Sequence, residues 1–415
     1  MNLKLLKNIM YLLLMQGVSY LIPLVTLPYL TRVLGLHDYG ALSTAITFIQ
    51  YAVLFVDFGF NFTATKKIAD HRDDFGYISL VFWETIYAKM LLALIVIIIF
   101  YFIIYFTPQF NGLSILFVVM IPQILGSVFF PVWFFQGVEK LSLISVVTMM
   151  SKLSTIPLLL LFVHSASDIV MAAVVTSFPL FFASLISLMF IYHGRLIQRP
   201  SFFKLDILKA IKDSVPLFLG TMAISLYILS TPLILGLTST FEQVGLFVAS
   251  DKLRTAMIGV FLILGQAIYP RVNALLSENT DGYWKFIKVL FILQFVLCGG
   301  AFVFFYFLIP VIAPMLLGKG FDGLTDILRI MSPMIMLVPM SVILANFILL
   351  PHGKKRVYAI IPAITATLHI FYSFILCFYL GAFGGALSIL LTEIISLSLL
   401  IYICYKNHYL HKVLT

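Results

Sequence analysis

The chain has 415 residues, of which 62% are hydrophobic and only 10% are charged, and its formal net charge is +9. This apolar content lies far outside the range of soluble globular domains and predicts a membrane protein with several spans. The three cysteines are far apart and lie in apolar runs, which excludes a disulfide framework and a cysteine zinc site.

The apolar runs are long enough to cross a bilayer as helices. A spanning helix needs roughly 20 mostly apolar residues, whereas the strands of a membrane barrel alternate over about 10 residues. By this measure the sequence predicts twelve transmembrane helices, at residues 9–34, 41–65, 78–106, 113–137, 141–163, 168–193, 211–237, 242–268, 286–312, 324–350, 357–380 and 383–405. The first run follows basic residues but lacks a small-residue cleavage site, so it is predicted to be a retained span. The expected fold class is an all-α polytopic membrane protein.

The basic residues between the spans predict the orientation. They accumulate in every second gap, with Lys66, Lys67, Arg195 and Arg271 among them, whereas the other gaps contain only Arg32, Lys319 and Arg329. Because Lys and Arg mark short cytoplasmic loops, both termini are predicted to be cytoplasmic. This topology accounts for the positive net charge, so no nucleic-acid partner is expected.

An internal repeat predicts the domain organisation. VLGLHDYGALSTA (residues 33–45) and ILGLTSTFEQVGLFVAS (residues 234–250) share a Leu-Gly-Leu, a short polar turn and a Gly that starts the next span. The repeat predicts two six-helix bundles, residues 1–205 and 206–415, around a central cavity. The alternative is chance, because Leu-Gly-Leu is frequent in hydrophobic proteins.

The eighth predicted span carries three charges, Asp251, Lys252 and Arg254. Counted from the outer end of the span, they lie roughly 14–18 Å deep, which is near the middle of a ~30 Å core. A charge at that depth costs on the order of 2.5–3.5 kcal/mol on insertion scales, so this face of the helix is predicted to point into the protein.

Cations outnumber acids near the predicted midplane, with Lys89, Lys152, Lys252 and Arg254 against Asp251 and Glu393. This excess predicts a cavity that receives an anion, lined by the four cations and by Arg32 at the outer mouth of the first span. Structural alternatives remain open. Arg254 can pair with Asp251 at i, i+3, Arg32 can simply mark the interface, and Lys89 and Lys152 can snorkel or pair with Glu84 or Glu393.

Buried acids are the candidates for ion coupling. A carboxylate within the membrane can bind H⁺ or Na⁺, which singles out Asp57, Glu393 and Asp251. Asp57 alternatively pairs with Lys66 or caps a loop. The sequence lacks a metal-ligand cluster, a G-x-x-x-x-G-K-[ST] loop and an HExxH helix, so we expect no metal site, no cofactor and no enzymatic activity.

Four stretches carry a family resemblance: PYLTRVLGLHDYG (28–40), FVDFGFNFTATKKIADHRDD (55–74), PVWFFQGVEK (131–140) and GQAIYPRV (265–272). They resemble the Wzx-type polysaccharide transporters, the O-antigen flippases of Gram-negative bacteria, in a superfamily with the MATE antiporters and the lipid II flippase. The resemblance implies a V-shaped pair of six-helix bundles that moves an undecaprenyl-diphosphate-linked oligosaccharide to the outer leaflet by alternating access, driven by an H⁺ or Na⁺ gradient. It also implies the bacterial inner membrane as the location, and membrane lipid, the O-antigen polymerase and the chain-length regulator as partners.

Three alternatives stay open, and one of them, a purely structural membrane scaffold, leaves the midplane charges unexplained. A multidrug or cation antiporter of the same fold favours an acidic cavity, whereas the predicted midplane is cationic. A membrane polymerase or glycosyltransferase of O-antigen synthesis needs a catalytic loop longer than the gaps of this sequence.

Overall fold

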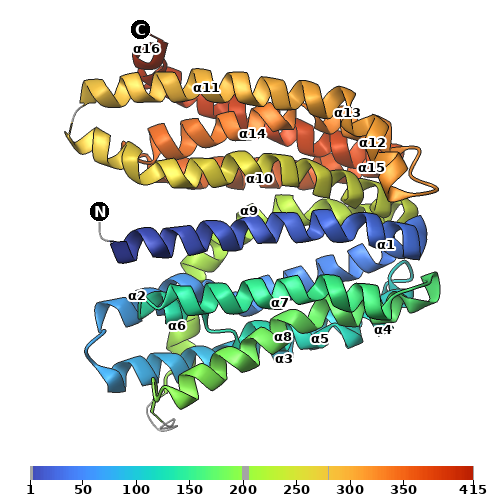
Figure 1. Cartoon of the computed structure of the whole chain (residues 1–415), viewed down its shortest axis with the longest axis horizontal. Helices are drawn as coiled ribbons and strands as arrows, with labels where there is room; N and C mark the ends of the chain where they lie inside the picture. Colours follow the sequence, from blue (N-terminus) through green and yellow to red (C-terminus); the bar gives the residue numbers. More distant parts are fainter. Residues whose placement is uncertain (1–2, 199–204, 279, 415) are drawn as a thin grey trace. The chain divides into compact units, whose positions relative to one another are not determined.

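The computed structural model describes residues 3–198, 205–278 and 280–414, and the elements assigned within these ranges are all helical (Figure 1). Among these residues, eight helices are long and apolar enough to cross a membrane, or nine if the bent pair Ile207–Ala223 and Ser225–Thr238 forms one span. The prediction of an all-α polytopic membrane protein is confirmed. The count of twelve spans stays a prediction.

Two helices each contain two of the predicted spans. α1 (Leu3–Asp57) has 55 residues and α15 (Lys355–Lys406) has 52. A helix of that length measures about 80 Å, far more than a ~30 Å hydrocarbon core. The backbone of each is non-helical at one glycine, Gly35 with φ 76° and Gly381 with φ 56°, in the left-handed region that glycine enters without steric strain. Each glycine lies between two predicted spans, so the helical path is interrupted where the sequence predicts a connection.

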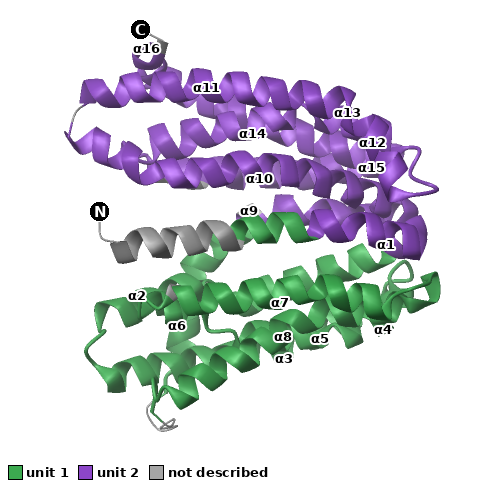
Figure 2. Ribbon diagram, in the orientation of Figure 1, with its two compact units in different colours: residues 1–22, 41–222 green, residues 23–40, 223–415 purple. Residues whose placement is uncertain are grey.

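One compact unit comprises residues 1–22 and 41–222 (Figure 2). Its helices after α1 are α2 (Phe60–Asp70), α3 (Phe75–Phe106), α4 (Ser114–Val119), α5 (Ile121–Phe129), α6 (Val132–Gly137), α7 (Leu141–Phe162), α8 (Ile169–His193) and the first part of α9 (Ile207–Thr238), with short 3₁₀ turns at Asn111–Leu113 and Ala166–Asp168. The predicted span 113–137 is divided into α4, α5 and α6. Pro122 lies in the first turn of α5 and Pro131 precedes α6, because proline begins a helix more readily than it continues one.

The other compact unit comprises residues 23–40 and 223–415 (Figure 2). It contains the second part of α9, α10 (Phe241–Glu278), α11 (Thr280–Phe307), α12 (Ile309–Leu317), α13 (Leu324–Met331), α14 (Met334–Val342), the π-helix η4 (Ile343–Leu349), α15 and α16 (Tyr409–Leu414). α9 bends by 56° at the junction of its two segments. The predicted bundle boundary at residues 205 and 206, and the cavity between bundles, stay predictions.

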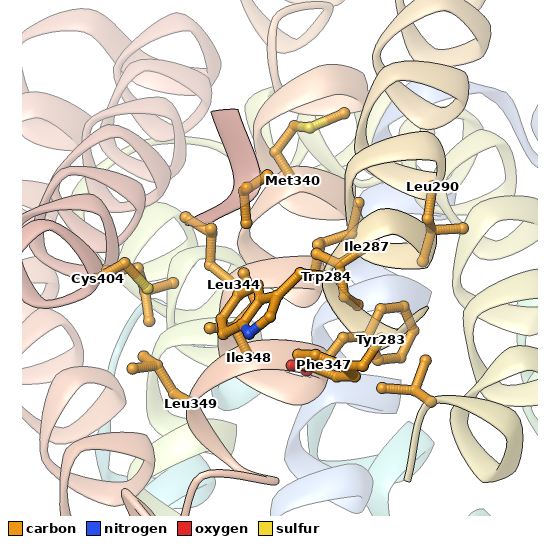
Figure 3. Packing of buried hydrophobic residues seen from close by; sticks show 14 of the residues in the cluster. Tyr283, Trp284, Ile287, Leu290, Met340, Leu344, Phe347, Ile348, Leu349 and Cys404 are labelled. Atoms are coloured by element: carbon orange, nitrogen blue, oxygen red, sulfur yellow. The ribbon is translucent and has the colours of Figure 1, made fainter. Parts of the chain in front are cut away.

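The core of the second unit is built where α11 meets η4 and α15 (Figure 3). Tyr283, Ile287 and Phe347 are almost completely buried there. The Tyr283 hydroxyl donates a hydrogen bond of 2.6 Å to the carbonyl oxygen of Phe347, which lies in the π-helical segment. A buried hydroxyl thus finds its acceptor in the irregular part of the helix, where backbone groups are offset from the ordinary pattern.

Apolar side chains are also exposed along helices of both units. On α3 they include Leu94, Ile98, Phe102 and Phe106, with exposed fractions from 48% to 71%. A continuous apolar surface of this kind is unfavourable in water and is typical of a helix that faces lipid.

Candidate functional site

The three charges of α10 form an ion pair and one separate cation. Nε and Nη2 of Arg254 donate hydrogen bonds of 3.0 and 2.6 Å to Oδ1 of Asp251, one helical turn earlier. The Arg254 side chain is 13% exposed. Arg254 is therefore paired with Asp251, as one of the two interpretations of the sequence predicts. Residues three apart lie on one face of a helix, which allows this contact.

A second carboxylate and a phenol complete the surroundings of Arg254. Glu393 of α15 is 7% exposed. Both Glu393 and Tyr227 of α9 interact electrostatically with the guanidinium. Three helices of the second unit thus contribute charged or polar groups to one buried cluster. One guanidinium thus interacts with two carboxylates, of which Asp251 is its hydrogen-bonded partner.

Lys252 is not part of this pair and lies against an aromatic ring. Its ammonium nitrogen is 5.2 Å from the ring centroid of Tyr39, which is itself 1% exposed. Among the described residues, no carboxylate oxygen lies within 4.0 Å of Lys252. A cation held over an aromatic face is not paired with an opposite charge and is oriented by the ring quadrupole. Lys252 is therefore available to an anionic ligand.

A buried hydrogen-bond network adjoins Glu393. The Thr392 hydroxyl lies 2.7 Å from Nδ1 of His369, 2.5 Å from the Tyr372 hydroxyl and 2.8 Å from the carbonyl oxygen of Ser388. A hydroxyl has one proton to donate, and the carbonyl can only accept, so Thr392 donates to Ser388 and accepts from the other two. Nε2 of His369 then accepts from the Thr231 hydroxyl at 3.1 Å.

Lys89 and Asp57 pair with each other in the first unit. Nζ of Lys89 lies 2.7 Å from Oδ1 of Asp57 and donates a second bond of 3.0 Å to the carbonyl oxygen of Ser127. The Lys89 side chain is 1% exposed, whereas that of Asp57 is 31% exposed. Neither residue takes the partner that the sequence suggests, which is Glu84 or Glu393 for Lys89 and Lys66 for Asp57.

The remaining two candidate cations have neutral partners. Nζ of Lys152 on α7 donates a 2.7 Å hydrogen bond to the Ser19 hydroxyl. Nη2 of Arg32 donates a 2.8 Å hydrogen bond to the carbonyl oxygen of Met315. Neither of these acceptors carries a negative charge, so neither cation is compensated by its hydrogen-bond partner.

The charge balance differs from the expectation. In the second unit, the acids Asp251 and Glu393 equal the cations Lys252 and Arg254 in number, although Lys252 itself is unpaired, and in the first unit Asp57 compensates Lys89. The excess of cations near the predicted midplane is therefore smaller than the sequence suggests, because that prediction counts only Asp251 and Glu393 among the acids and omits Asp57. The charge argument against an antiporter becomes correspondingly weaker.

Sequence reasoning missed several groups of these clusters, including Tyr39, Ser127 and Thr392. For Thr392 the only signal is its spacing of four from Ser388, which is common in any helix. Within the described residues, no group of three or more His, Cys, Asp or Glu side chains is placed to hold a metal ion.

Comparison with known proteins places the chain in a sequence family. The model of the family described as polysaccharide biosynthesis protein matches residues 5–276. The chain is also similar to two proteins that carry the name "Putative O-antigen transporter". One, from Escherichia coli (strain K12), is 31% identical over 408 residues, which is 98% of each chain. The other, from Shigella dysenteriae, is 29% identical over 389 residues, covering 94% of this chain and 97% of the relative.

Solved membrane proteins share the fold. An inward-facing multidrug resistance MATE family transporter of the MOP superfamily aligns with a TM-score of 0.70 at 14% identity, over 98% of this chain and 96% of its own. The lipid II flippase MurJ, in an inward closed conformation, aligns with a TM-score of 0.70 at 13% identity, over 99% of this chain and 89% of its own. At such identities the likeness concerns the fold alone.

Proposed function

The chain belongs to the polysaccharide biosynthesis protein family, and on this premise we propose that it is a flippase for undecaprenyl-diphosphate-linked O-antigen repeat units. In this proposal it moves the lipid-linked oligosaccharide from the cytoplasmic to the periplasmic leaflet by alternating access. It acts in the bacterial inner membrane with both termini in the cytoplasm. It is a transporter and makes or breaks no covalent bond of the sugar.

The observation that carries the proposal is the full-length similarity to the relatives named as O-antigen transporters. The E. coli relative matches through 98% of both chains, so the similarity covers both compact units. The fold shared with a lipid II flippase also supports the proposal, because that fold is compatible with the transport of a lipid-linked sugar. Fold likeness by itself does not identify a substrate.

The diphosphate of the substrate gives the unpaired cations a role. Phosphate oxygens attract Lys and Arg through charge-assisted hydrogen bonds. Of the five candidate cations, Lys252, Lys152 and Arg32 have neutral partners in the structure, whereas Lys89 and Arg254 are paired with carboxylates. We assign the substrate headgroup chiefly to Lys252, because an ammonium beside a buried ring is both oriented and uncompensated.

Glu393 is the favoured residue for coupling to an ion gradient. It is nearly buried, and no hydrogen bond to its carboxylate is recorded among the described residues, whereas Asp251 and Asp57 are held by Arg254 and Lys89. A buried carboxylate that lacks a direct partner gains most from binding H⁺ or Na⁺. Movement of Arg254 between Asp251 and Glu393 would then link ion binding to the conformation of α10.

A multidrug or cation antiporter is the second candidate, favoured by the two carboxylates that face Arg254 and by the MATE fold. The two functions differ in what accumulates when the protein is absent. A flippase defect leaves lipid-linked oligosaccharide on the cytoplasmic face. An antiporter defect raises sensitivity to lipophilic cations and does not change the distribution of the lipid-linked oligosaccharide between the two leaflets. A membrane polymerase or glycosyltransferase would leave the oligosaccharide outside but unpolymerised.

The test is a leaflet assay in a strain from which the gene has been deleted. Lipid-linked oligosaccharide exposed outside is labelled in spheroplasts with a membrane-impermeant aldehyde-forming oxidant, and total oligosaccharide is measured after lysis. We expect external label with the wild type, and little with the empty vector or Lys252→Gln. Lys252→Arg, which keeps the charge, should restore label at equal membrane abundance. External but unpolymerised oligosaccharide in the deletion strain would refute the flippase assignment and would indicate a defect in polymerisation. The O-antigen polymerase and the chain-length regulator are the proposed protein partners of the flippase.

A further inference from the structure

The first unit contains a cavity of about 790 Å³ that includes none of the charged candidates discussed above. It lies where the beginning of α3 meets the end of α8. Its apolar lining includes Phe82, Trp83, Ile86, Leu188, Ile191 and Tyr192. Pockets that hold small organic ligands measure about 300–1,000 Å³ and are mostly apolar with a few polar groups. The size and lining therefore suit a ligand with a substantial apolar part.

The polar rim of this cavity is fixed by the chain that follows α8. Nε1 of Trp83 donates a 2.8 Å hydrogen bond to the carbonyl oxygen of Gln198, and the backbone N–H of Gln198 donates one of 2.8 Å to the Ser79 hydroxyl. Arg195 has φ 46°, so the backbone turns sharply directly after the helix. These contacts hold residues 195–198 beside the start of α3 and place Arg195 at the cavity.

The charge at the rim is positive and uncompensated. His193 and Arg195 line the cavity together with Gln198, and none of the described residues that line it is acidic. None of the ion pairs among the described residues includes Arg195, although Lys67 and Arg72 of the same unit are paired with Asp213 and Glu139. An unpaired guanidinium offers a forked set of donors that matches the oxygens of a phosphate.

The surroundings indicate that the ligand comes from the membrane. The α8 residues preceding the cavity, Leu185, Ile186 and Met189, are apolar and exposed, as expected where a helix faces lipid. The distribution of Lys and Arg predicts that this end of α3 and α8 lies at the cytoplasmic surface. The inner leaflet is rich in anionic headgroups, which attract basic residues placed at that surface.

We propose that this cavity binds an anionic phospholipid of the inner leaflet, with an acyl chain against Phe82, Ile86 and Ile191 and the phosphate at Arg195. The site is separate from the charged clusters and does not depend on the flippase assignment. Its occupant is a resident lipid that fixes the junction of α3 and α8.

Trp83 provides a fluorescent reporter for the test. The full chain is reconstituted into phosphatidylcholine nanodiscs that contain increasing fractions of phosphatidylglycerol brominated on its acyl chains. Bromine quenches a nearby indole, and the other two tryptophans, Trp133 and Trp284, are at most 8% exposed and do not line the cavity. We expect a saturable quenching with brominated phosphatidylglycerol that is absent with brominated phosphatidylcholine and is lost in Trp83→Phe.

The matched variants separate charge from general lipid contact. Arg195→Gln should weaken the saturable phase about fivefold, as expected for one cation at an anionic surface. Arg195→Lys should retain most of it, and Arg356→Gln, which removes an exposed cation outside the cavity, should leave it unchanged. Leu188→Phe, which narrows the cavity without adding a tryptophan, should weaken it as well.

Three results would overturn the proposal. Equal quenching by both brominated lipids would mean ordinary contact with bulk lipid. An unchanged saturable phase in both Arg195→Gln and Leu188→Phe would place the lipid elsewhere. Displacement of the brominated lipid by undecaprenyl phosphate at a much lower concentration than by unlabelled phosphatidylglycerol would assign the cavity to an isoprenoid lipid. If Arg195→Gln does not fold, the comparison of the two lipids on the wild type and on Leu188→Phe still decides the question.

Discussion

The Lys89 ammonium lies 2.7 Å from a carboxylate oxygen of Asp57, and the two side chains differ sharply in exposure. Lys89 is 1% exposed and depends on Asp57 and on the Ser127 carbonyl for compensation, whereas Asp57 is 31% exposed. Removal of one partner of a buried pair leaves the other charge uncompensated, and the penalty depends on how well that remaining charge is solvated. The pair is thus asymmetric in what each partner contributes.

This asymmetry predicts the order of two single variants. Asp57→Ala leaves a buried ammonium without its partner. The free energy of unfolding should fall by about 3–5 kcal/mol, the loss typical of a broken buried pair. Lys89→Met leaves a carboxylate that is partly solvated and should be milder. Thermal unfolding of the purified protein in one detergent gives the ranking.

The double variant Asp57→Ala with Lys89→Met is the control for this prediction. It removes both charges and should be more stable than Asp57→Ala alone, because no uncompensated ammonium remains. Additive losses, or a larger loss for Lys89→Met than for Asp57→Ala, would show that the two charges do not depend on each other.

Tyr39 is predicted to act through its ring rather than through its hydroxyl. The hydroxyl is buried without a hydrogen-bond partner among the described residues, and the ring lies under the Lys252 ammonium. Tyr39→Phe removes an unsatisfied polar group and keeps the ring, so stability should be unchanged or higher and export retained. Tyr39→Leu removes a cation–π contact of about 0.5–2 kcal/mol and should reduce export. The leaflet assay and the unfolding midpoint, measured on both variants, check this; reduced export in Tyr39→Phe would contradict it.

The sequence predicts the helices well because apolar length is a local property. The predicted spans fall mostly on residues that are helical in the structure, with short breaks such as those at Phe58–Gly59 and Phe130–Pro131. The internal breaks are harder to predict. Pro122 and Pro131 divide one predicted span into three short helices, and whether a proline kinks or interrupts a membrane helix depends on neighbours that satisfy the freed backbone groups.

The charged site could be predicted only where the pairing is local. Asp251 and Arg254 are three residues apart on one helix, so their bond follows from helical geometry. Lys89 and Asp57 lie on different helices, and their contact depends on how each helix is rotated about its axis. A depth counted from uncertain span ends can err by a whole turn, so counting along the sequence does not bring Asp57 and Lys89 together. Composition sets the number of charges, and tertiary packing decides which of them are compensated.

Thr392 is predicted to be the central residue of the network beside Glu393. Thr392 is 2% exposed, and its hydroxyl has His369, Tyr372 and Ser388 as hydrogen-bond partners. Thr392→Val keeps the shape but leaves the donors of His369 and Tyr372 without their acceptor, at a cost of about 1–3 kcal/mol for each group left unsatisfied. We expect a lower unfolding midpoint for Thr392→Val and near wild-type stability for Thr392→Ser, which keeps the hydroxyl. Equal midpoints for the two variants would show that the hydroxyl is dispensable.

The last prediction concerns Gly40 and Gly245, the glycines at equivalent positions of the internal repeat. A Cβ atom at Gly40 would lie 1.8 Å from the carbonyl oxygen of Phe241 and 3.0 Å from the backbone nitrogen of Gly245. A Cβ at Gly245 would lie 2.6 Å from the carbonyl oxygen of Leu36. The obstructing atoms belong to the backbone and cannot move aside as a flexible side chain can. The two helix starts approach this closely only because both positions lack a side chain.

Gly40→Ala should therefore destabilise the protein strongly. Gly245→Ala should destabilise it somewhat less, because the added Cβ would lie farther from the obstructing backbone oxygen, at 2.6 Å instead of 1.8 Å. Gly299→Ala is the matched control, since a Cβ there meets no atom within 4 Å and alanine is favoured over glycine in a helix by about 1 kcal/mol. In thermal unfolding the control should equal or exceed the wild type while Gly40→Ala unfolds at a clearly lower temperature. If Gly40→Ala were as stable as Gly299→Ala, the close approach of α1 and α10 would not be needed for the fold, and the Leu-Gly-Leu repeat would be better explained as chance.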